Sequence, residues 1–188
     1  MKVAAIVWFL IFAMCPMVGI CQGRGVSIGL EQDVLPYLTN GYYFGAWAGK
    51  SHLRGRALIA HVTKPDFIVP SGFTNNIVTA YALVGDYFLK SDWNGWWLSA
   101  GIVYWDSSIQ SKLKINTASY QNVLVNGSLG YNWELGKNFY ISPWAGLHVR
   151  VGGATEVLVD GASFTTPLLN PEASLKLGWY FQSKNKGK

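Results

Sequence analysis

Hydrophobic and polar residues alternate strictly near the end of the sequence, between positions 171 and 181. One set of alternate positions is mostly apolar and ends in aromatic groups: Pro171, Ala173, Leu175, Leu177, Trp179 and Phe181. The other set is largely polar: Glu172, Ser174, Lys176, Gly178 and Tyr180. Because successive side chains of a strand point to opposite faces, the segment predicts a β-strand with one face suited to lipid and one suited to a polar interior.

The same alternation recurs along the chain. It is clear over 121–135 and 139–151, where bulky apolar groups share one face and amide, hydroxyl and charged groups share the other. With the turn residues, it predicts eight strands, at 25–37, 41–49, 52–63, 76–90, 95–109, 119–135, 139–152 and 169–181. The predicted fold class is therefore all-β: an eight-stranded antiparallel transmembrane β-barrel with up-and-down topology.

The connections between the predicted strands alternate in length. Short turns are expected at 49–51, 92–95 and 134–138, and the second of these contains the Asn-Gly signal of a tight hairpin. Longer, more polar connections fall at 64–75, 111–118 and 153–167, and only the first hairpin, near 39–41, breaks this pattern. In outer-membrane barrels the short turns are periplasmic and the long loops are external. An even number of strands then places both termini in the periplasm.

Composition also favours a membrane protein. Only 13% of the residues are charged, against about 25% in soluble domains, and the chain holds nine Trp and ten Tyr. Beyond the N-terminal segment no run of about 20 apolar residues occurs, which argues against membrane-spanning helices. A soluble ligand-binding barrel is the alternative fold.

The first 21 residues predict a secretory signal peptide. Lys2 precedes an apolar run and a small-residue stretch ending at Cys21, so cleavage would leave Gln22 first. Lipoprotein processing at Cys21 is the alternative. Both cysteines lie in this segment, so the mature chain would lack disulfides and cysteine chemistry. The predicted organisation is a signal peptide at 1–21, a barrel at 22–181 and a basic periplasmic tail at 182–188.

Net charge gives little support to nucleic acid binding. Of the formal charge of +5, Lys2 supplies one unit and the tail lysines supply three: Lys184, Lys186 and Lys188. The barrel itself is therefore close to neutral.

The alternating strands and the closing Trp-Tyr-Phe run at 179–181 resemble the small eight-stranded outer-membrane barrels of the OmpA/OmpX/OmpW type. The segment from Asp33 to Tyr43 is similar to uncharacterised outer-membrane barrel proteins. The resemblance implies a location in the bacterial outer membrane. Its expected partners are outer-membrane lipid, lipopolysaccharide and, during biogenesis, the barrel assembly machinery.

Charged residues are expected inside the barrel. Projection by strand parity predicts an interior charge network of nine residues: Glu31, Asp33, Arg54, Arg56, Glu134, His148, Arg150, Glu172 and Lys176. An eight-stranded barrel is only wide enough for its side chains, and unpaired buried charges are costly. We therefore expect a charge-paired plug, in which Arg54 or Arg56 pairs with Glu31 or Asp33 across neighbouring strands. A gated polar path or a pocket for a small polar ligand is the alternative.

Aromatic residues are expected to form a girdle at the periplasmic ends of the strands. Its predicted members are Trp93, Trp96, Tyr131, Trp133, Phe139, Trp179 and Phe181.

The favoured function is structural or interactive, without cofactor or enzyme activity. One alternative is transport, either of a small polar solute through the interior or of an apolar compound through a lateral opening. Another is a lipid-modifying enzyme, with His61 near Ser71, Ser107 and Ser108, although no Phe-His-x-Ser-Asn motif is present. The three histidines lack metal-ligand spacing, so no metal site is expected.

Two loops, 65–76 and 153–167, are moderately apolar. They predict either strand extensions above the membrane or a surface that meets a protein partner or admits a hydrophobic ligand.

Overall fold

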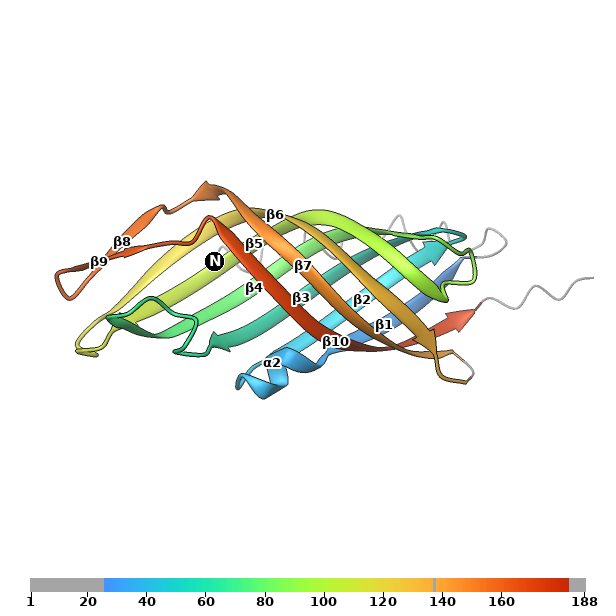
Figure 1. Ribbon diagram of the computed structural model, residues 1–188, viewed down its shortest axis with the longest axis horizontal. Helices are drawn as coiled ribbons and strands as arrows, with labels where there is room; N and C mark the ends of the chain where they lie inside the picture. The colour runs from blue at the N-terminus through green and yellow to red at the C-terminus, as the bar shows by residue number, and fades with distance from the viewer. Residues whose placement is uncertain (1–25, 137, 183–188) are drawn as a thin grey trace, which may run out of the picture.

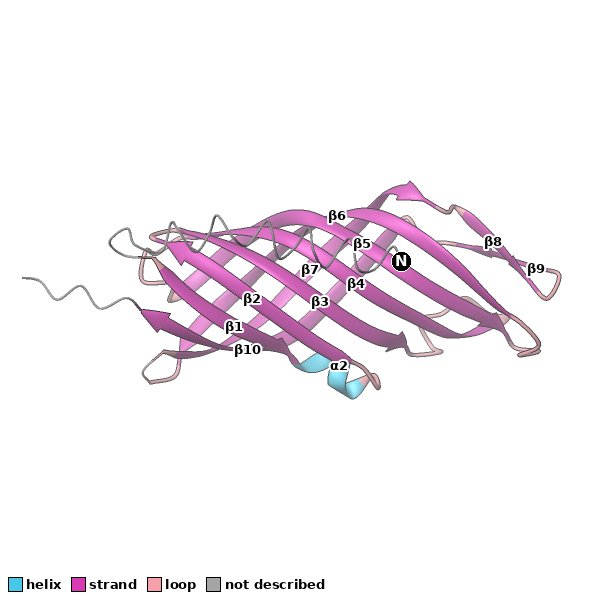
Figure 2. Cartoon of the chain, turned by 180° about the vertical axis from the view of Figure 1, so that it is seen from behind, coloured by secondary structure: helices cyan, strands magenta, loops and turns pink. Residues whose placement is uncertain are grey.

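Eight antiparallel strands close into a barrel in the computed structural model, which describes residues 26–136 and 138–182 (Figures 1 and 2). The barrel strands are β1 (Ser27–Asp33), β2 (Tyr42–Lys50), β3 (Leu53–Lys64), β4 (Phe73–Phe88), β5 (Gly95–Ser111), β6 (Thr117–Glu134), β7 (Phe139–Gly153) and β10 (Leu169–Gln182). Their order around the ring is β1-β10-β7-β6-β5-β4-β3-β2, so the predicted up-and-down barrel is confirmed. The predicted signal peptide and nearly all of the predicted tail fall outside the described residues.

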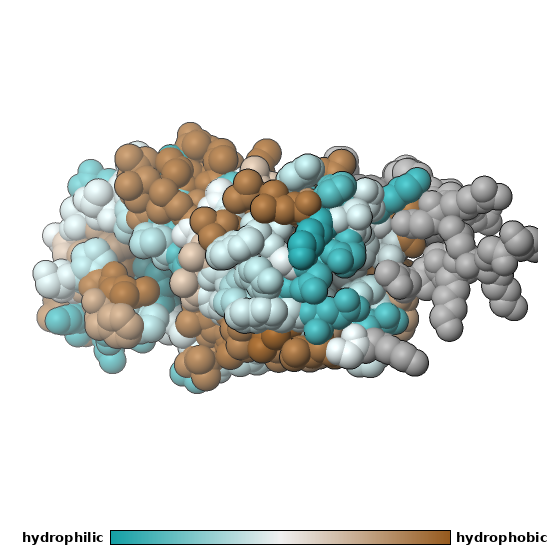
Figure 3. All heavy atoms as spheres, turned by 45° about the vertical axis from the view of Figure 1, so that its right-hand side comes forward, coloured by the Kyte–Doolittle hydropathy of each residue, from teal (hydrophilic) through white to brown (hydrophobic). Residues whose placement is uncertain are grey.

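Strand parity separates the two faces as the alternation predicts. On β4, Leu83 and Tyr87 are exposed, whereas Val84, Asp86 and Phe88 are buried. The exposed positions carry many large apolar side chains, and Figure 3 shows hydrophobic groups gathered in patches along the flanks of the barrel. Within the described residues, no helix has the length and apolar character needed to cross a membrane.

The first strand is shorter than predicted, and this is the main error in the strand boundaries. It ends at Asp33 instead of continuing to 37, and the one-turn helix α2 (Val34–Leu38) follows. The Asp33 carboxylate accepts a hydrogen bond from the Leu35 N–H at 3.2 Å, which caps the helix. Pro36 has no N–H to offer a strand ladder, so a turn of helix is the better local conformation.

The long loop after β7 forms a separate hairpin of β8 (Glu156–Val159) and β9 (Ala162–Thr165). Figure 1 shows this hairpin projecting beyond the end of the barrel opposite to the β10 terminus. Its apolar residues pack with the β3–β4 loop and with the ends of β4, β5 and β6 next to it, in an outer cluster of Val69, Phe73, Ile109, Tyr120, Val159 and Phe164. The apolar loop residues thus form a small core of their own, and their role in meeting a partner stays a prediction.

Acidification is expected to release this hairpin. Asp160, at its tip, accepts hydrogen bonds from the Ser111 hydroxyl and from the backbone and side chain of Asn116. These bonds, that from Ser111 foremost, hold the pKa of Asp160 below its usual range. The stabilisation is therefore complete above the ordinary aspartate pKa of about 3.9, and it is lost as the pH falls through the lowered value.

Amide hydrogen exchange at Asn116, corrected for its intrinsic rate, measures this clamp. Protection should be present at neutral pH, should fall in strong acid, and should be absent at both in Asp160→Ala. Equal protection of Asn116 in that variant at neutral pH would show that Asp160 does not hold the hairpin.

Candidate functional site

Aromatic side chains fill the interior at the end that carries the short turns. Six buried residues form this layer: Trp47, Phe88, Trp93, Trp97, Tyr140 and Tyr180. Several of the rings pack edge to face, as Trp93 does on Trp47 with 5.2 Å between centroids. Such contacts add specific geometry to the apolar area that the rings bury.

Trp93 was predicted in the outer girdle, and that prediction is wrong. Its φ of 61° lies in the left-handed region, which is unusual for a bulky residue. This turn brings the side chain back over the barrel mouth, where the indole N–H donates to the carbonyl of Ser51. Trp93 is only 7% exposed, so it is part of the interior layer.

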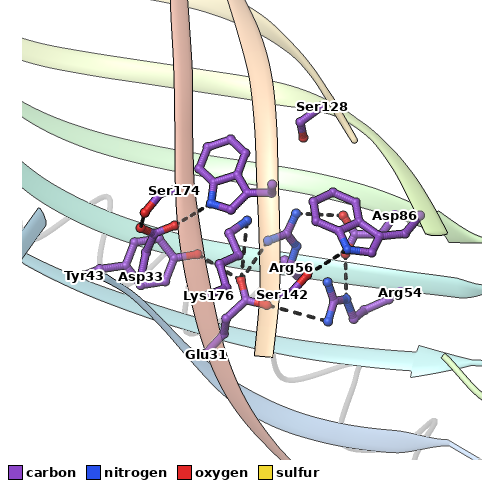
Figure 4. A network of polar contacts seen from close by, with 12 residues as sticks. Glu31, Asp33, Tyr43, Arg54, Arg56, Asp86, Ser128, Ser142, Ser174 and Lys176 are labelled. Atoms are coloured by element: carbon purple, nitrogen blue, oxygen red, sulfur yellow. Dashed lines mark hydrogen bonds and ion pairs between the residues drawn. The ribbon is translucent and has the colours of Figure 1, made fainter. Parts of the chain in front are cut away.

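An ion-pair ring, shown in Figure 4, lies beside the aromatic layer, since Arg54 lies over the Trp47 and Phe88 rings. Arg54 donates to Asp86 at 2.6 Å, and Arg56 donates to Asp86 and to Glu31, each at 2.8 Å. Arg54 also lies 3.6 Å from Glu31, so two arginines alternate with two carboxylates. All four side chains are almost fully buried. Charges removed from water need both neutralisation and hydrogen bonds. The ring pairs each charge with an opposite one and supplies most of the hydrogen bonds, although the Arg56 Nε has no partner among the described residues.

Tyrosine hydroxyls and aromatic faces complete the surroundings of the ring. Glu31 accepts from Tyr140 at 2.7 Å and from Tyr43 at 3.2 Å. The Arg54 guanidinium lies 4.9 Å from the Phe88 ring centroid, and the Arg56 guanidinium lies 5.4 Å from that of Trp97. Cation–π contacts of this kind are strongest where water is excluded.

The absence of a side chain at Gly178 makes room for the Tyr140 ring beside the ion-pair ring. A Cβ at this position would overlap the Tyr140 ring, which lies across the glycine from the neighbouring strand β7. The Tyr140 hydroxyl can therefore reach Glu31, and Arg54 donates to it at 3.1 Å.

The outer half of the barrel contains a cavity of about 500 Å³. Its walls are largely apolar, and side chains of β3, β4 and β5 supply much of them: Leu58, Ala60, Val62, Val78, Ala80, Ala82, Val84 and Val103. Its floor contains polar groups, among them Arg56 and Lys176. A cavity of this size and lining is typical of sites for small ligands.

The cavity also reaches the barrel wall between β3 and β10. The β1–β10 pairing ends at Asp33 opposite Lys176, so residues 169–175 of β10 have no strand partner on that side among the described residues. Helix α2 lies in this gap, anchored by a hydrogen bond from the Leu35 N–H to the Ser174 hydroxyl at 3.1 Å. Figure 1 shows α2 well short of the end that β5 and β6 reach, so the wall is lower here.

The predicted interior charges divide into two groups. Glu31, Arg54, Arg56 and Lys176 lie together in or beside the ring. Asp33 does not pair with either arginine, because its carboxylate accepts from Trp144 and Ser174.

The remaining predicted charges lie away from the ring. His148 and Glu172 form a separate pair with 2.9 Å between Nε2 and Oε2. Arg150 is half-buried, and its Nε has no hydrogen-bond partner among the described residues. Glu134 is exposed near the turn after β6 and accepts from the Tyr180 hydroxyl.

Asp86 was not among the predicted residues, although it is central to the ring. Its parity on β4 matches the buried Val84 and Phe88, so the projection used for the other strands could have found it. The aromatic partners of the ring, Tyr140 and Trp97, carry no comparable signal, because their contacts depend on which strands lie opposite one another.

The other six predicted girdle residues have outward positions. Trp96, Trp133, Trp179 and Phe181 are about half exposed, and Tyr131 and Phe139 are partly exposed. Their rings pack against one another in pairs such as Trp96 with Tyr131. Their contact with a membrane interface stays a prediction.

His61 does not lie in an obvious catalytic arrangement. Its Nδ1 is 2.9 Å from the Thr79 hydroxyl, and its ring stacks on Tyr42 with 5.4 Å between centroids. Among the described residues, no group of three or more His, Cys, Asp or Glu side chains has the geometry to hold a metal ion.

A closed eight-stranded barrel with many apolar side chains on its outer surface and buried ion pairs in its interior defines a small outer-membrane-type β-barrel fold. The N-terminal β-barrel domain of Pseudomonas aeruginosa OprF has a similar fold, with a TM-score of 0.53 and 12% identity over 83% of this chain and 96% of that one. Neisserial surface protein A matches with a TM-score of 0.47 and 8% identity, over 82% and 92% of the two chains. No family model and no curated protein matches the chain. The closed strand order and the match to the OprF barrel confirm the fold that the sequence resemblance implies.

Proposed function

We propose that the protein is an integral barrel of the bacterial outer membrane that does not conduct solutes and acts by binding on its outer side. The observation that carries this proposal is the closure of the interior by two adjoining layers, the aromatic cluster and the ion-pair ring. A solute crossing the barrel would have to separate buried, mutually neutralised charges, which is costly in a low-dielectric interior.

The division of the interior supports a role in binding. One half is filled with rings and ion pairs, while the other half holds the apolar cavity. A transport path for polar solutes would need polar groups along its whole length, whereas the cavity walls are mostly aliphatic. The contacts of His61 with the Thr79 hydroxyl and the Tyr42 ring give no support to a lipid-modifying reaction.

Planar-bilayer recording of the purified barrel tests this proposal. We expect no steady single-channel steps, because Trp93 and the ion-pair ring close the interior in series. Trp93→Ala should also remain closed, since the ring is still intact behind it. Insertion is verified by flotation of the same protein with liposomes, and a larger porin added to the same bilayer serves as the positive control. Reproducible steps from the inserted, unmodified barrel would refute the closed interior.

A further inference from the structure

The ammonium group of Lys176 is the unusual feature of the cavity floor. The residue is only 3% exposed and lines the cavity. Its nearest acidic atom is Glu31 Oε1 at 3.7 Å, which is beyond hydrogen-bonding distance. Within the described part of the chain, Nζ forms no hydrogen bond, although an ammonium group has three to donate.

The carboxylates near Lys176 already accept hydrogen bonds from other groups. The Glu31 carboxylate already accepts from Arg56, Tyr43 and Tyr140. The carboxylate of Asp33 is turned toward Trp144 and Ser174. On its other sides Nζ lies 4.2 Å from the Trp144 ring centroid and 5.4 Å from that of Trp97.

Of the three bases in and beside the ion-pair ring, Lys176 is the one that lacks a short contact with an acid among the described residues. Arg54 and Arg56 hold Glu31 and Asp86 at 2.6–2.8 Å, whereas Lys176 lies 3.7 Å from Glu31. Asp33, which lies opposite Lys176 in the pairing of β1 with β10, is the third buried acid, and it accepts hydrogen bonds from Trp144 and Ser174 instead. The cavity thus combines aliphatic walls with a buried, under-used cation at its base.

The residues that line the cavity indicate that it opens through the side of the barrel. Thr63 on β3 and Pro171 and Ala173 on β10 have outward parity, yet all three contribute to its lining. The cavity therefore extends through the wall between these strands, beside α2. Lys64 spans part of this entrance, with its Nζ 3.3 Å from the Asn170 side-chain oxygen.

We propose that this cavity binds a monocarboxylic acid with an apolar body, such as a medium-chain fatty acid. The carboxylate accepts hydrogen bonds from the Lys176 ammonium group, and the apolar body lies against the aliphatic wall of β3 and β4. Such a molecule enters from the lipid phase through the gap between β3 and β10. The inference rests on the proposed closed interior, because the aromatic and ion-paired layers form the floor at which the carboxylate stops.

Calorimetric titration of the full barrel in lipid nanodiscs tests the site, with octanoate as the probe and octanol as its uncharged counterpart. Empty nanodiscs correct for partition into lipid. Hydrogen bonds to charged groups contribute about 1.5–3 kcal/mol, so octanoate should bind about tenfold or more tightly than octanol. Octanoate that binds no better than octanol would overturn the proposal.

Three variants locate the carboxylate. Lys176→Met should weaken octanoate binding about tenfold or more and leave octanol unchanged. Lys64→Met removes the same charge at the entrance, where Nζ already donates to the Asn170 side chain, and should change octanoate affinity by less than about threefold. The reverse order of effects would place the carboxylate at the rim and contradict the assignment. Ala82→Phe places a large side chain in the cavity while Lys176 itself is unchanged, and it should abolish binding of both probes.

Retention of the folded, heat-modifiable form on gels is required of each variant. If Lys176→Met does not fold, Ala82→Phe and Lys176→Arg decide the matter, since the first should lose binding and the second should keep it. Octanoate binding that survives Ala82→Phe would show that the cavity is not the site. Bilayer recording separates the two proposals. If the barrel does not conduct and binds no octanoate, only the proposed ligand is wrong. If the barrel conducts, the proposed closed interior is wrong as well.

Discussion

Asp86→Asn is expected to lower the free energy of unfolding by about 3–5 kcal/mol. The substitution keeps the size of the side chain and removes the negative charge that both Arg54 and Arg56 contact at 2.6–2.8 Å. Glu31 alone would then face two buried guanidinium groups and Lys176. Breaking one member of a buried ion pair costs much more than the pair contributes, because the remaining charge stays desolvated.

Urea unfolding of the barrel in lipid vesicles, followed by tryptophan fluorescence, measures this loss. Asp106→Asn is the matched control, since Asp106 is exposed on the neighbouring strand β5, and it should change stability by less than about 0.5 kcal/mol. An effect of Asp86→Asn no larger than that of the control would mean that the ring contributes nothing to stability.

Gly178→Ala is expected to destabilise the barrel by about 1–3 kcal/mol, the usual cost of overpacking an interior. The new Cβ overlaps the Tyr140 ring, so that ring must move. Its hydroxyl would then leave Glu31 and Arg54. The expected loss combines steric displacement with weaker support for the ion-pair ring.

Gly127→Ala supplies the control for this prediction, because a Cβ at Gly127 meets nothing within 4 Å. It is expected to be neutral or slightly stabilising, since alanine reduces the freedom of the unfolded chain. A second check is the effect of Gly178→Ala in a Tyr140→Ala background, where the overlap no longer exists and the cost should largely disappear. Equal losses in both backgrounds would contradict the steric cause.

The barrel itself could be predicted from the sequence because its strongest signal is local. Alternation with a period of two identifies each strand and its inward face, which explains why Glu31, Arg56 and Lys176 could be placed inside. The pairing of Arg56 with Glu31 was also within reach of parity. The expectation that the paired residues lie on neighbouring strands is wrong, because β2 lies between β1 and β3 in the ring. Alternation along the chain does not show which side chains can reach one another across the barrel.

The errors in the predicted strand bounds and inward residues have physical causes that the alternation of apolar and polar residues does not report. The Asn-Gly pair correctly marked the β4–β5 turn, but Trp93 and Gly95 adopt the positive φ values, and this turns Trp93 inward. The capping by Asp33 and the missing N–H of Pro36 end β1 early. The cavity depends on small inward side chains such as Ala80 and Ala82 meeting across a lowered wall, and no single strand reveals that combination.

The short first strand has a consequence for aggregation between copies of this protein. A closed barrel has no free strand edge, yet here the ring is complete only as far as Asp33 and Lys176. Beyond that point the partnerless stretch of β10 would be a template for strand addition from a second molecule. Helix α2 covers that stretch through Leu35 and Ser174, and a helix laid over an edge is one of the ways in which natural sheets prevent edge-to-edge aggregation. In this barrel a single turn of helix therefore covers the strand edge that a longer β1 would otherwise pair with.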